Sequence, residues 1–198
     1  FYVDSTRKDT TGTFDQSDFE LIMEQVEHVK GVTPQTGSWG TAEGPKGDFD
    51  INIVGGTTSL QYYLTDPITK GKYFSQNDYD AGNNVCVITE SNAVALFGTT
   101  DVIGMSFDVT LWGITQEMRI IGLRKDNATA LVSMGYGTTT IQAEAPMSYL
   151  ANKFGFYIDE FSQFYVIADS SEHATEVASK TLKLLEGRHD VRGENQIM

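Results

Sequence analysis

The chain has 198 residues, of which 40% are hydrophobic and 21% are charged, a composition typical of a folded globular protein. This length is enough to bury one large core or two small ones. The formal net charge of −13 at pH 7 argues against nucleic-acid binding, because an acidic surface repels phosphate groups.

The one cysteine, Cys86, excludes a disulfide framework within the chain and a zinc site built from several thiolates. Because it lies in an apolar run, we expect it to be a buried, unreactive thiol. No apolar run approaches the ~20 residues that span a bilayer. The sequence shows no signal-peptide pattern and starts at Phe1 instead of a methionine, so we expect a segment of a longer polypeptide.

The N-terminal part of the sequence predicts a strand, a helix and a hairpin. Residues 1–3 are typical of a short strand. Ser17 and Glu20 match the S-x-x-E pattern of a helix start, and apolar residues then recur at helical spacing until Gly31. After a glycine-rich turn region, residues 48–54 alternate between apolar and polar, which predicts the second strand of a hairpin.

The middle of the sequence predicts a strand, a short helix and a second hairpin. Residues 85–88 are continuously apolar and rich in β-branched side chains, as in a strand covered on both faces. Residues 90–97 read as a short helix. The alternation over 106–111 predicts a half-buried strand, which a turn at 112–113 connects to a returning strand at 118–123.

The remaining elements follow in chain order: strands at 130–134 and 139–143, a helix from 146 to 154, a strand at 161–168, an amphipathic helix from 174 that ends at 187, and a last strand at 196–198. Together the elements predict an α+β fold of two subdomains. Residues 1–58 and 159–198 would form one discontinuous subdomain of paired strand–helix–strand units. Residues 59–158 would form an inserted, mixed α/β subdomain, and the two chain ends would lie close together.

We predict no catalytic site, no metal site and no cofactor. The histidines His28, His173 and His189 show no spacing that places two on one helix face or beside a useful carboxylate. No nucleophile elbow, phosphate-binding loop or dinucleotide-binding motif occurs. The oxygen-rich run 78–84 resembles a calcium loop but lacks the glycine at its sixth position and the acidic residue at its twelfth, where Thr89 stands.

Aromatic residues gather ahead of the apolar strand at 85–88. Core packing accounts for most members of such a cluster, whereas an exposed subset can bind a partner or a ligand. We predict a partner surface that includes Tyr62, Tyr63, Tyr73 and Tyr79. The sequence alone does not divide these residues into buried and exposed ones.

A series of short motifs connects the chain to a known family. In the middle stretch they are Gly71-Lys72-Tyr73-Phe74, Val85-Cys86-Val87-Ile88, Leu96-Phe97-Gly98, Asp101-Val102-Ile103-Gly104 and Ile120-Ile121-Gly122-Leu123. Two more flank it, Gly31-Val32-Thr33-Pro34 and Leu184-Leu185-Glu186-Gly187-Arg188-His189. In the order and spacing of these motifs, over nearly its whole length, the chain resembles the extracytoplasmic domain of MacB-type ABC transporter permeases, a superfamily that includes the FtsX-like proteins.

The resemblance implies a domain inserted between the first two transmembrane helices of a bacterial permease, on the extracytoplasmic side of the cell membrane. It implies that the discontinuous subdomain is porter-like and the inserted one Sabre-like. Domains of this family perform no chemistry: they relay motion driven by a cytoplasmic ATP-binding subunit or domain to cargo, or to a membrane-fusion or other accessory protein. The parent protein would be dimeric and the isolated domain monomeric.

Two hypotheses from other functional classes remain to be weighed. The aromatic cluster is compatible with a free-standing extracellular module that binds a ligand or a glycan. A hydrolase of unrecognised geometry is disfavoured, because the sequence shows no nucleophile–base pair.

Overall fold

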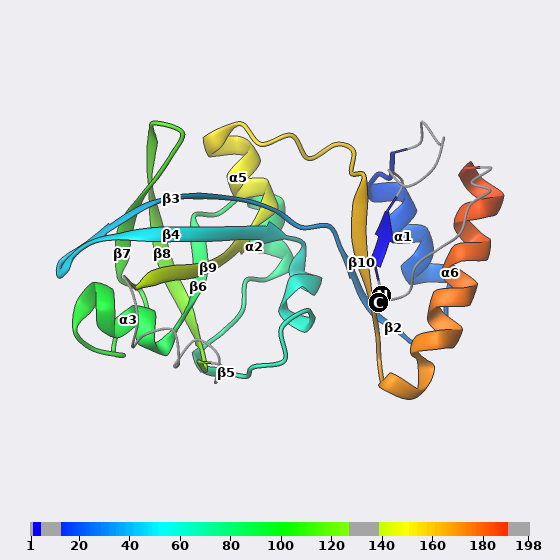
Figure 1. Ribbon diagram of the computed structural model, residues 1–198, viewed down its shortest axis with the longest axis horizontal. Coiled ribbons are helices and arrows are strands. Elements are labelled where there is room, and N and C mark those ends of the chain that lie inside the picture. Colours follow the sequence, from blue (N-terminus) through cyan, green and yellow to red (C-terminus); the bar gives the residue numbers. More distant parts are fainter. Residues whose placement is uncertain (1, 5–12, 127–138, 190–198) are drawn as a thin grey trace. The chain divides into compact units, whose positions relative to one another are not determined.

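The computed structural model describes residues 2–4, 13–126 and 139–189 (Figure 1). The α+β class that the sequence predicts is confirmed, since helices and paired strands both run through the chain. The chain divides into two compact units. Unit 1 is Phe1–Gln35, Ser59–Leu64 and Tyr157–Met198, and unit 2 is Thr36–Thr58 and Thr65–Phe156.

Unit 1 contains a three-stranded antiparallel sheet and two long helices. The strands are β1 (Tyr2–Asp4), β2 (Val29–Thr33) and β10 (Gln163–Ala168), in the order β1-β10-β2. The helices are α1 (Gln16–Gln25) and α6 (Ala174–His189), and the short turn η2 (Ser171–His173) precedes α6. Figure 1 shows both helices on the same side of this sheet.

The core of unit 1 forms where these helices meet the sheet. Phe164 and Val166 of β10 are buried on the helix side, and Phe19 and Ile22 of α1 pack against them. The rings of Phe19 and Phe164 lie 4.9 Å apart, within the range of favourable aromatic pairs. The helical spacing along α1 therefore places its buried residues as the sequence predicts, whereas β10, where both faces are largely apolar in sequence, buries mainly the face that carries Phe164 and Val166.

Helix α1 begins and ends earlier than the sequence predicts. Its N-cap is Asp15, whose carboxylate accepts a hydrogen bond from the backbone N–H of Asp18 at 3.2 Å. Asp18 returns the interaction by accepting from the N–H of Asp15 at 2.9 Å, so this pair forms the capping box expected of Ser17 and Glu20. The helix ends at Gln25, and a turn at residues 26–28 then leads into β2.

Unit 2 is built on a seven-stranded sheet in the order β5-β8-β6-β9-β4-β3-β7. Its strands are β3 (Thr36–Gly44), β4 (Gly47–Gly56), β5 (Ile68–Gly71), β6 (Val85–Thr89), β7 (Ser106–Leu111), β8 (Ile114–Arg124) and β9 (Thr140–Pro146). Strand β7 also pairs with β8 along the hairpin, so the ladder from β8 through β6, β9, β4, β3 and β7 returns to β8. These strands thus close into a ring around the core.

The described residues of unit 2 also form the helices α2 (Gln76–Ala81), α3 (Glu90–Phe97) and α5 (Met147–Phe154). The predicted strand at 85–88, the helix at 90–97 and the hairpin after it are confirmed. Cys86 is fully buried, as expected, and burial raises the pKa of its thiol. The predicted strands at 130–134 and 196–198, and the expected closeness of the chain ends, lie outside the described residues.

The first hairpin belongs to a different unit from the one expected. The sequence predicts residues 36–58 in the discontinuous subdomain, but they contribute β3 and β4 to the sheet of unit 2. Strand β4 pairs in parallel with β9 from Asp50 to Gly56, and alternation within β4 does not reveal this distant partner. Residues 59–64, expected in the insertion, belong to unit 1.

Strand β3 occupies the glycine-rich stretch that was expected to be a turn region. A Cβ atom on Gly37 would lie 2.3 Å from the carbonyl oxygen of Ile53, and one on Gly40 would lie 2.2 Å from that of Thr110. The glycines therefore permit close backbone approach within the sheet. None of the helices in the described part of the chain combines the length and apolarity that a membrane crossing requires.

Candidate interaction surface

Two of the four tyrosines predicted to form a partner surface are exposed together in unit 1. Tyr62 ends the short helix η1 (Thr58–Tyr62), and Tyr63 follows it, with 37% and 43% of their surfaces exposed. The Lys30 ammonium lies 4.6 Å from the centre of the Tyr62 ring, and the Tyr63 ring meets that of Tyr165 edge-on at 4.8 Å. We call these four residues, Lys30, Tyr62, Tyr63 and Tyr165, the aromatic face.

The aromatic face depends on a glycine in β2. A Cβ atom on Gly31 would lie 2.6 Å from the Ser59 Cβ and 3.2 Å from the Tyr62 ring, so only glycine lets η1 approach this closely. Tyr165 alternates along β10 with two buried core residues and therefore projects to the opposite side of the sheet from the helices. The aromatic face thus lies on the side of this sheet that α1 and α6 leave open.

The other two predicted tyrosines, Tyr73 and Tyr79, belong to unit 2. Tyr73 is only 9% exposed, and its hydroxyl donates a hydrogen bond to Oε1 of Glu144 at 2.8 Å. It is a core residue, which corrects its assignment to a partner surface. Tyr79 is half-buried in α2, and burial raises its pKa to about 12. Of the four tyrosines, Tyr62 and Tyr63 belong to unit 1 and to the aromatic face, whereas Tyr73 and Tyr79 belong to unit 2.

Tyr73 takes part in a buried polar network that the sequence analysis missed. Arg124 donates from Nε to Oε2 of Glu144 at 2.8 Å and from Nη2 to Oε1 at 2.9 Å, a bidentate pair. Its Nη1 donates to the backbone oxygen of Asp66. Arg124 ends β8, one residue beyond the returning strand that the sequence predicts at 118–123, and the apolar run before it was the available signal that its side chain is buried. The network joins β8 to β9 across β6 and is buried, so we assign it a structural role.

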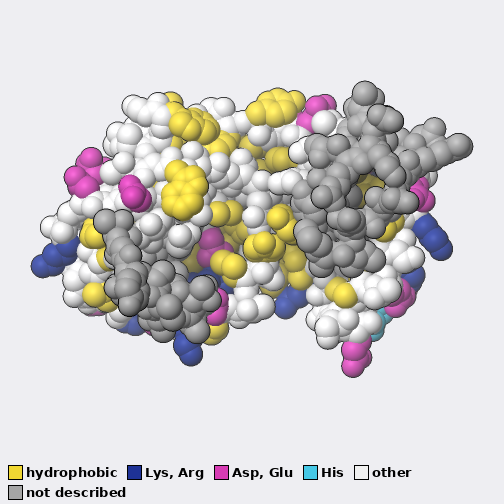
Figure 2. All heavy atoms as spheres, in the orientation of Figure 1, with side chains coloured by type: hydrophobic (Ala, Val, Ile, Leu, Met, Phe, Trp, Pro, Cys, Tyr) yellow, Lys and Arg dark blue, Asp and Glu magenta, His cyan; other side chains and the backbone are white. Residues whose placement is uncertain are grey.

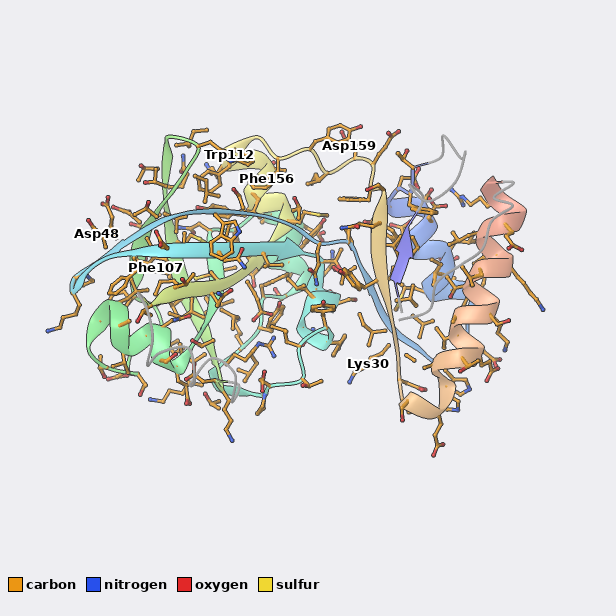
Figure 3. The ribbon with its side chains drawn as sticks, viewed as in Figure 1. Lys30, Asp48, Phe107, Trp112, Phe156 and Asp159 are labelled. Carbon is orange, nitrogen blue, oxygen red and sulfur yellow. The ribbon has the colours of Figure 1, made fainter. Side chains whose placement is uncertain are left out.

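A second aromatic pair, also missed, joins the exposed Trp112 at the turn between β7 and β8 to the partly buried Phe156. Trp112 is 62% exposed, and its ring lies 4.6 Å from that of Phe156 (Figure 3). The backbone of Trp112 and Gly113 has φ angles of 50° and 79°, as a tight hairpin turn requires. Large hydrophobic side chains are visible at the surface of the face shown in Figure 2. Such exposed aromatic groups are typical of contact surfaces.

Unit 2 also has a hollow of about 340 Å³ lined by Thr41, Asp48, Phe49, Asp50 and Thr139. Its lining offers two carboxylates, two hydroxyls and one aromatic ring. Its exposed lining surface is mostly apolar, but the hollow is open to solvent, whereas pockets for small molecules enclose the ligand. The hollow therefore does not suggest a substrate site.

The expectation that no histidine lies beside a carboxylate is wrong. Nδ1 of His28 lies 3.0 Å from one oxygen of Asp169, and Nδ1 of His173 lies 2.7 Å from the other. The spacing of four residues between Asp169 and His173 was a readable signal for one contact. The contact with His28, 141 residues away, arises only because β2 pairs with β10.

The sequence matches the family described as the MacB-like periplasmic core domain over residues 1–184. Among curated proteins, the ABC transporter permease YknZ of Bacillus subtilis (strain 168) is 24% identical over 186 residues. That alignment covers 94% of this chain and 44% of the relative. The chain therefore spans less than half the length of the curated relative that it matches.

Two solved structures are similar in fold. The extracellular domain of the noncanonic ABC-type transporter YknZ from Gram-positive bacteria aligns with a TM-score of 0.68 and 22% identity, over 97% of this chain and 94% of that chain. The periplasmic region of MacB from Actinobacillus actinomycetemcomitans aligns with a TM-score of 0.69 and 19% identity, over 96% and 83%. At these identities, the likeness shows the fold.

Proposed function

Because this chain belongs to the family of MacB-like periplasmic core domains, we propose that it is the extracytoplasmic domain of a bacterial ABC transporter permease. The observation that carries the proposal is the family match over residues 1–184, which the similar folds of the YknZ and MacB domains support. In this role the domain is non-catalytic. It couples ATP-driven motion of the permease to export or to an accessory protein outside the membrane.

The division of the chain into two units supports mechanical coupling. The chain passes between the units at four places, after Gln35, Thr58, Leu64 and Phe156. Each unit has its own hydrophobic core, so each resists deformation as a packed body. Motion applied to the N-terminal or C-terminal segment reaches unit 1 first, because both segments belong to it, and is transmitted to unit 2 along these connections.

The partners follow from this role. A cytoplasmic ATP-binding subunit or domain acts on this chain indirectly, through the membrane part of a dimeric parent protein, while the isolated domain is monomeric. We assign contact with a membrane-fusion or other accessory protein to the aromatic face, of which Tyr62 and Tyr63 are the exposed members. Replacing both with alanine should reduce co-purification of the parent permease with its accessory protein. Tyr157→Ala is the matched control, since Tyr157 is 65% exposed and lies outside this face.

The location of the domain is tested by cysteine labelling of the parent protein in cells. Cys86 is fully buried and gives no background, so Glu43→Cys on the exposed side of β3 supplies the reactive thiol. A membrane-impermeant maleimide should label this variant before the inner membrane is broken. Labelling only after lysis, or a parent reading frame without flanking apolar runs of ~20 residues, would refute the permease assignment.

A second candidate function, a free-standing module that binds a ligand or glycan, is favoured by the exposure of the same two tyrosines. It requires that the isolated chain bind a small saccharide or another small molecule with measurable affinity. That affinity should be lost in Tyr62→Ala or Tyr63→Ala while the fold is retained. The permease assignment requires no such affinity, so a glycan-array and calorimetry screen distinguishes the two functions.

A further inference from the structure

Two imidazoles and one carboxylate converge at one end of unit 1. His28 precedes β2, Asp169 follows β10, and His173 ends the turn η2 that leads into α6. Nδ1 of each imidazole faces a different oxygen of the Asp169 carboxylate, at 3.0 Å for His28 and 2.7 Å for His173. The two rings are stacked, with their centres 3.6 Å apart and their planes at 18°.

The backbone holds the three residues in this arrangement. Val29 pairs with Ala168 at the end of the sheet, and the N–H of Asp169 donates to the backbone oxygen of His28 at 2.8 Å. The φ angle of His28 is 65°, a left-handed conformation that is uncommon for residues other than glycine. The turn η2 then returns His173 to the same carboxylate. Three separate elements therefore contribute one side chain each.

We propose that His28, Asp169 and His173 form a binding site for a zinc ion. Two imidazole nitrogens and one carboxylate oxygen are a ligand set typical of Zn²⁺ in proteins. The three ligand atoms lie within 4.8 Å of one another, and a tetrahedral zinc ion requires neighbouring ligand atoms about 3.3 Å apart. Rotation of the side chains brings them to that spacing, and a water molecule completes the coordination.

Zinc binding changes the arrangement of the two rings in a defined way. An imidazole binds a metal in the plane of its ring, so two stacked rings must fan apart to share one ion. Each neutral ring then carries its hydrogen on Nε2 and offers the lone pair of Nδ1 to the metal. The side chains of His28, Asp169 and His173 are 36%, 45% and 34% exposed, which leaves room for this rotation and for entry of the ion.

The charges around the cluster favour a cation. The Glu176 carboxylate on α6 interacts electrostatically with both histidines. Lys180 pairs with Glu176 at 2.7 Å and with Glu27 at 3.8 Å. Glu176 and Glu27 thus share the Lys180 ammonium, and Asp169 adds a third carboxylate, so these four groups carry a net negative charge that attracts a divalent ion.

The competing interpretation is that the cluster only joins β2, β10 and α6 by hydrogen bonds. In that case both Nδ1 atoms carry hydrogen, the rings stay stacked, and added zinc changes nothing. The two interpretations predict different responses of the same three side chains to Zn²⁺, so a titration of the chain with this ion separates them.

The test is calorimetric titration of the metal-free 198-residue chain with Zn²⁺ near neutral pH, together with Co²⁺ as a spectroscopic probe. We expect one ion per chain and the visible absorption of four-coordinate cobalt. His173→Ala, Asp169→Asn and His28→Asn should each weaken binding at least about tenfold, since even outer partners of metal ligands contribute that much. Asparagine is chosen at position 28 because it tolerates a positive φ angle.

The control is His189→Ala, which removes the third histidine of the sequence and should leave binding unchanged. A nitrogen-15 NMR spectrum of the histidine rings needs no substitution: zinc should shift the Nδ1 signals of two histidines, and Mg²⁺ should shift none. The proposal is overturned if Zn²⁺ and Co²⁺ show no saturable binding. It is equally overturned if binding survives all three cluster substitutions, or is lost in His189→Ala alone.

Discussion

Arg124 and Glu144 form a buried, bidentate ion pair inside unit 2, with the two donor–acceptor distances at 2.8 and 2.9 Å. They come from β8 and β9, and β6 runs between these strands, so the guanidinium reaches across a neighbouring strand. Both residues are less than a tenth exposed. Both carboxylate oxygens of Glu144 accept from Arg124, and Oε1 also accepts from the Tyr73 hydroxyl.

The first prediction concerns this pair. Glu144→Ala should lower the free energy of unfolding by about 3–5 kcal/mol, because it leaves the guanidinium buried without its counter-charge. The double variant Arg124→Met with Glu144→Leu should lose much less of the free energy of unfolding, since no charge stays buried. Urea unfolding measures both, with Arg119→Met, an exposed arginine of β8, as the control. A double variant as unstable as Glu144→Ala would contradict this account.

The second prediction concerns the N-cap of α1 and pH. A hydrogen bond from Ser17 lowers the pKa of Asp15 below its usual 3.8, with burial opposing the shift, so the folded state favours the carboxylate. The stability that Asp15 contributes is therefore present above pH 3.8 and is lost as the pH falls through the folded pKa.

Asp15→Ala should accordingly lower the free energy of unfolding by about 1 kcal/mol near neutral pH and by less in acid. Asp15→Asn should keep most of the cap and lose its pH dependence, because the amide oxygen still accepts the N–H of Asp18. Urea midpoints of the three proteins at several pH values test this. If Asp15→Ala lowered the stability by the same amount at every pH, the charge of the carboxylate would be irrelevant to the cap.

The third prediction contrasts two glycines of unit 1. Gly31→Ala places a methyl group 2.6 Å from Ser59 and should cost about 1–3 kcal/mol, as overpacking does. Gly187→Ala in α6 meets nothing within 4 Å and should stabilise the protein by about 0.5–1 kcal/mol through helix propensity. Thermal unfolding compares them, and near-ultraviolet circular dichroism should change only for the first. Equal changes in thermal stability for the two variants would argue against close packing of η1 on β2.

The fourth prediction concerns Cys86. Burial at the centre of β6 raises the pKa of this thiol, so the reactive thiolate is scarce at neutral pH and the sulfur is also inaccessible. A maleimide should leave the native chain unmodified and should label it fully in denaturant. Mass spectrometry measures the modified fraction. Labelling of the native chain within minutes would show that β6 opens readily.

Elements with local signals could be predicted from the sequence. The run Val85–Ile88 becomes the buried strand β6, and Trp112 with Gly113 becomes the hairpin turn between β7 and β8. Features that depend on distant partners could not. The pairing of β4 with β9 places the first hairpin in unit 2. The glycines of β3 are explained only by backbone atoms that approach them from distant parts of the chain.

The candidate sites follow the same division. Tyr62 and Tyr73 look alike in the sequence, yet one lies on η1 at the surface and the other donates to a buried carboxylate. His28 reaches Asp169 only through the pairing of β2 with β10. Aromatic content and histidine spacing indicate which residues to consider, but strand pairing decides which of them meet.

The closed ladder of unit 2 limits how another polypeptide can associate with it. Because β7 pairs with both β3 and β8, the strands from β8 round to β7 each have neighbours on two sides. This pairing restricts the addition of another strand to the ring, a common route to both recognition and aggregation, to the stretches that are paired on one side only. Association with this ring is therefore expected to rely on side chains, so that exposed rings such as Trp112 would decide which partner is accepted.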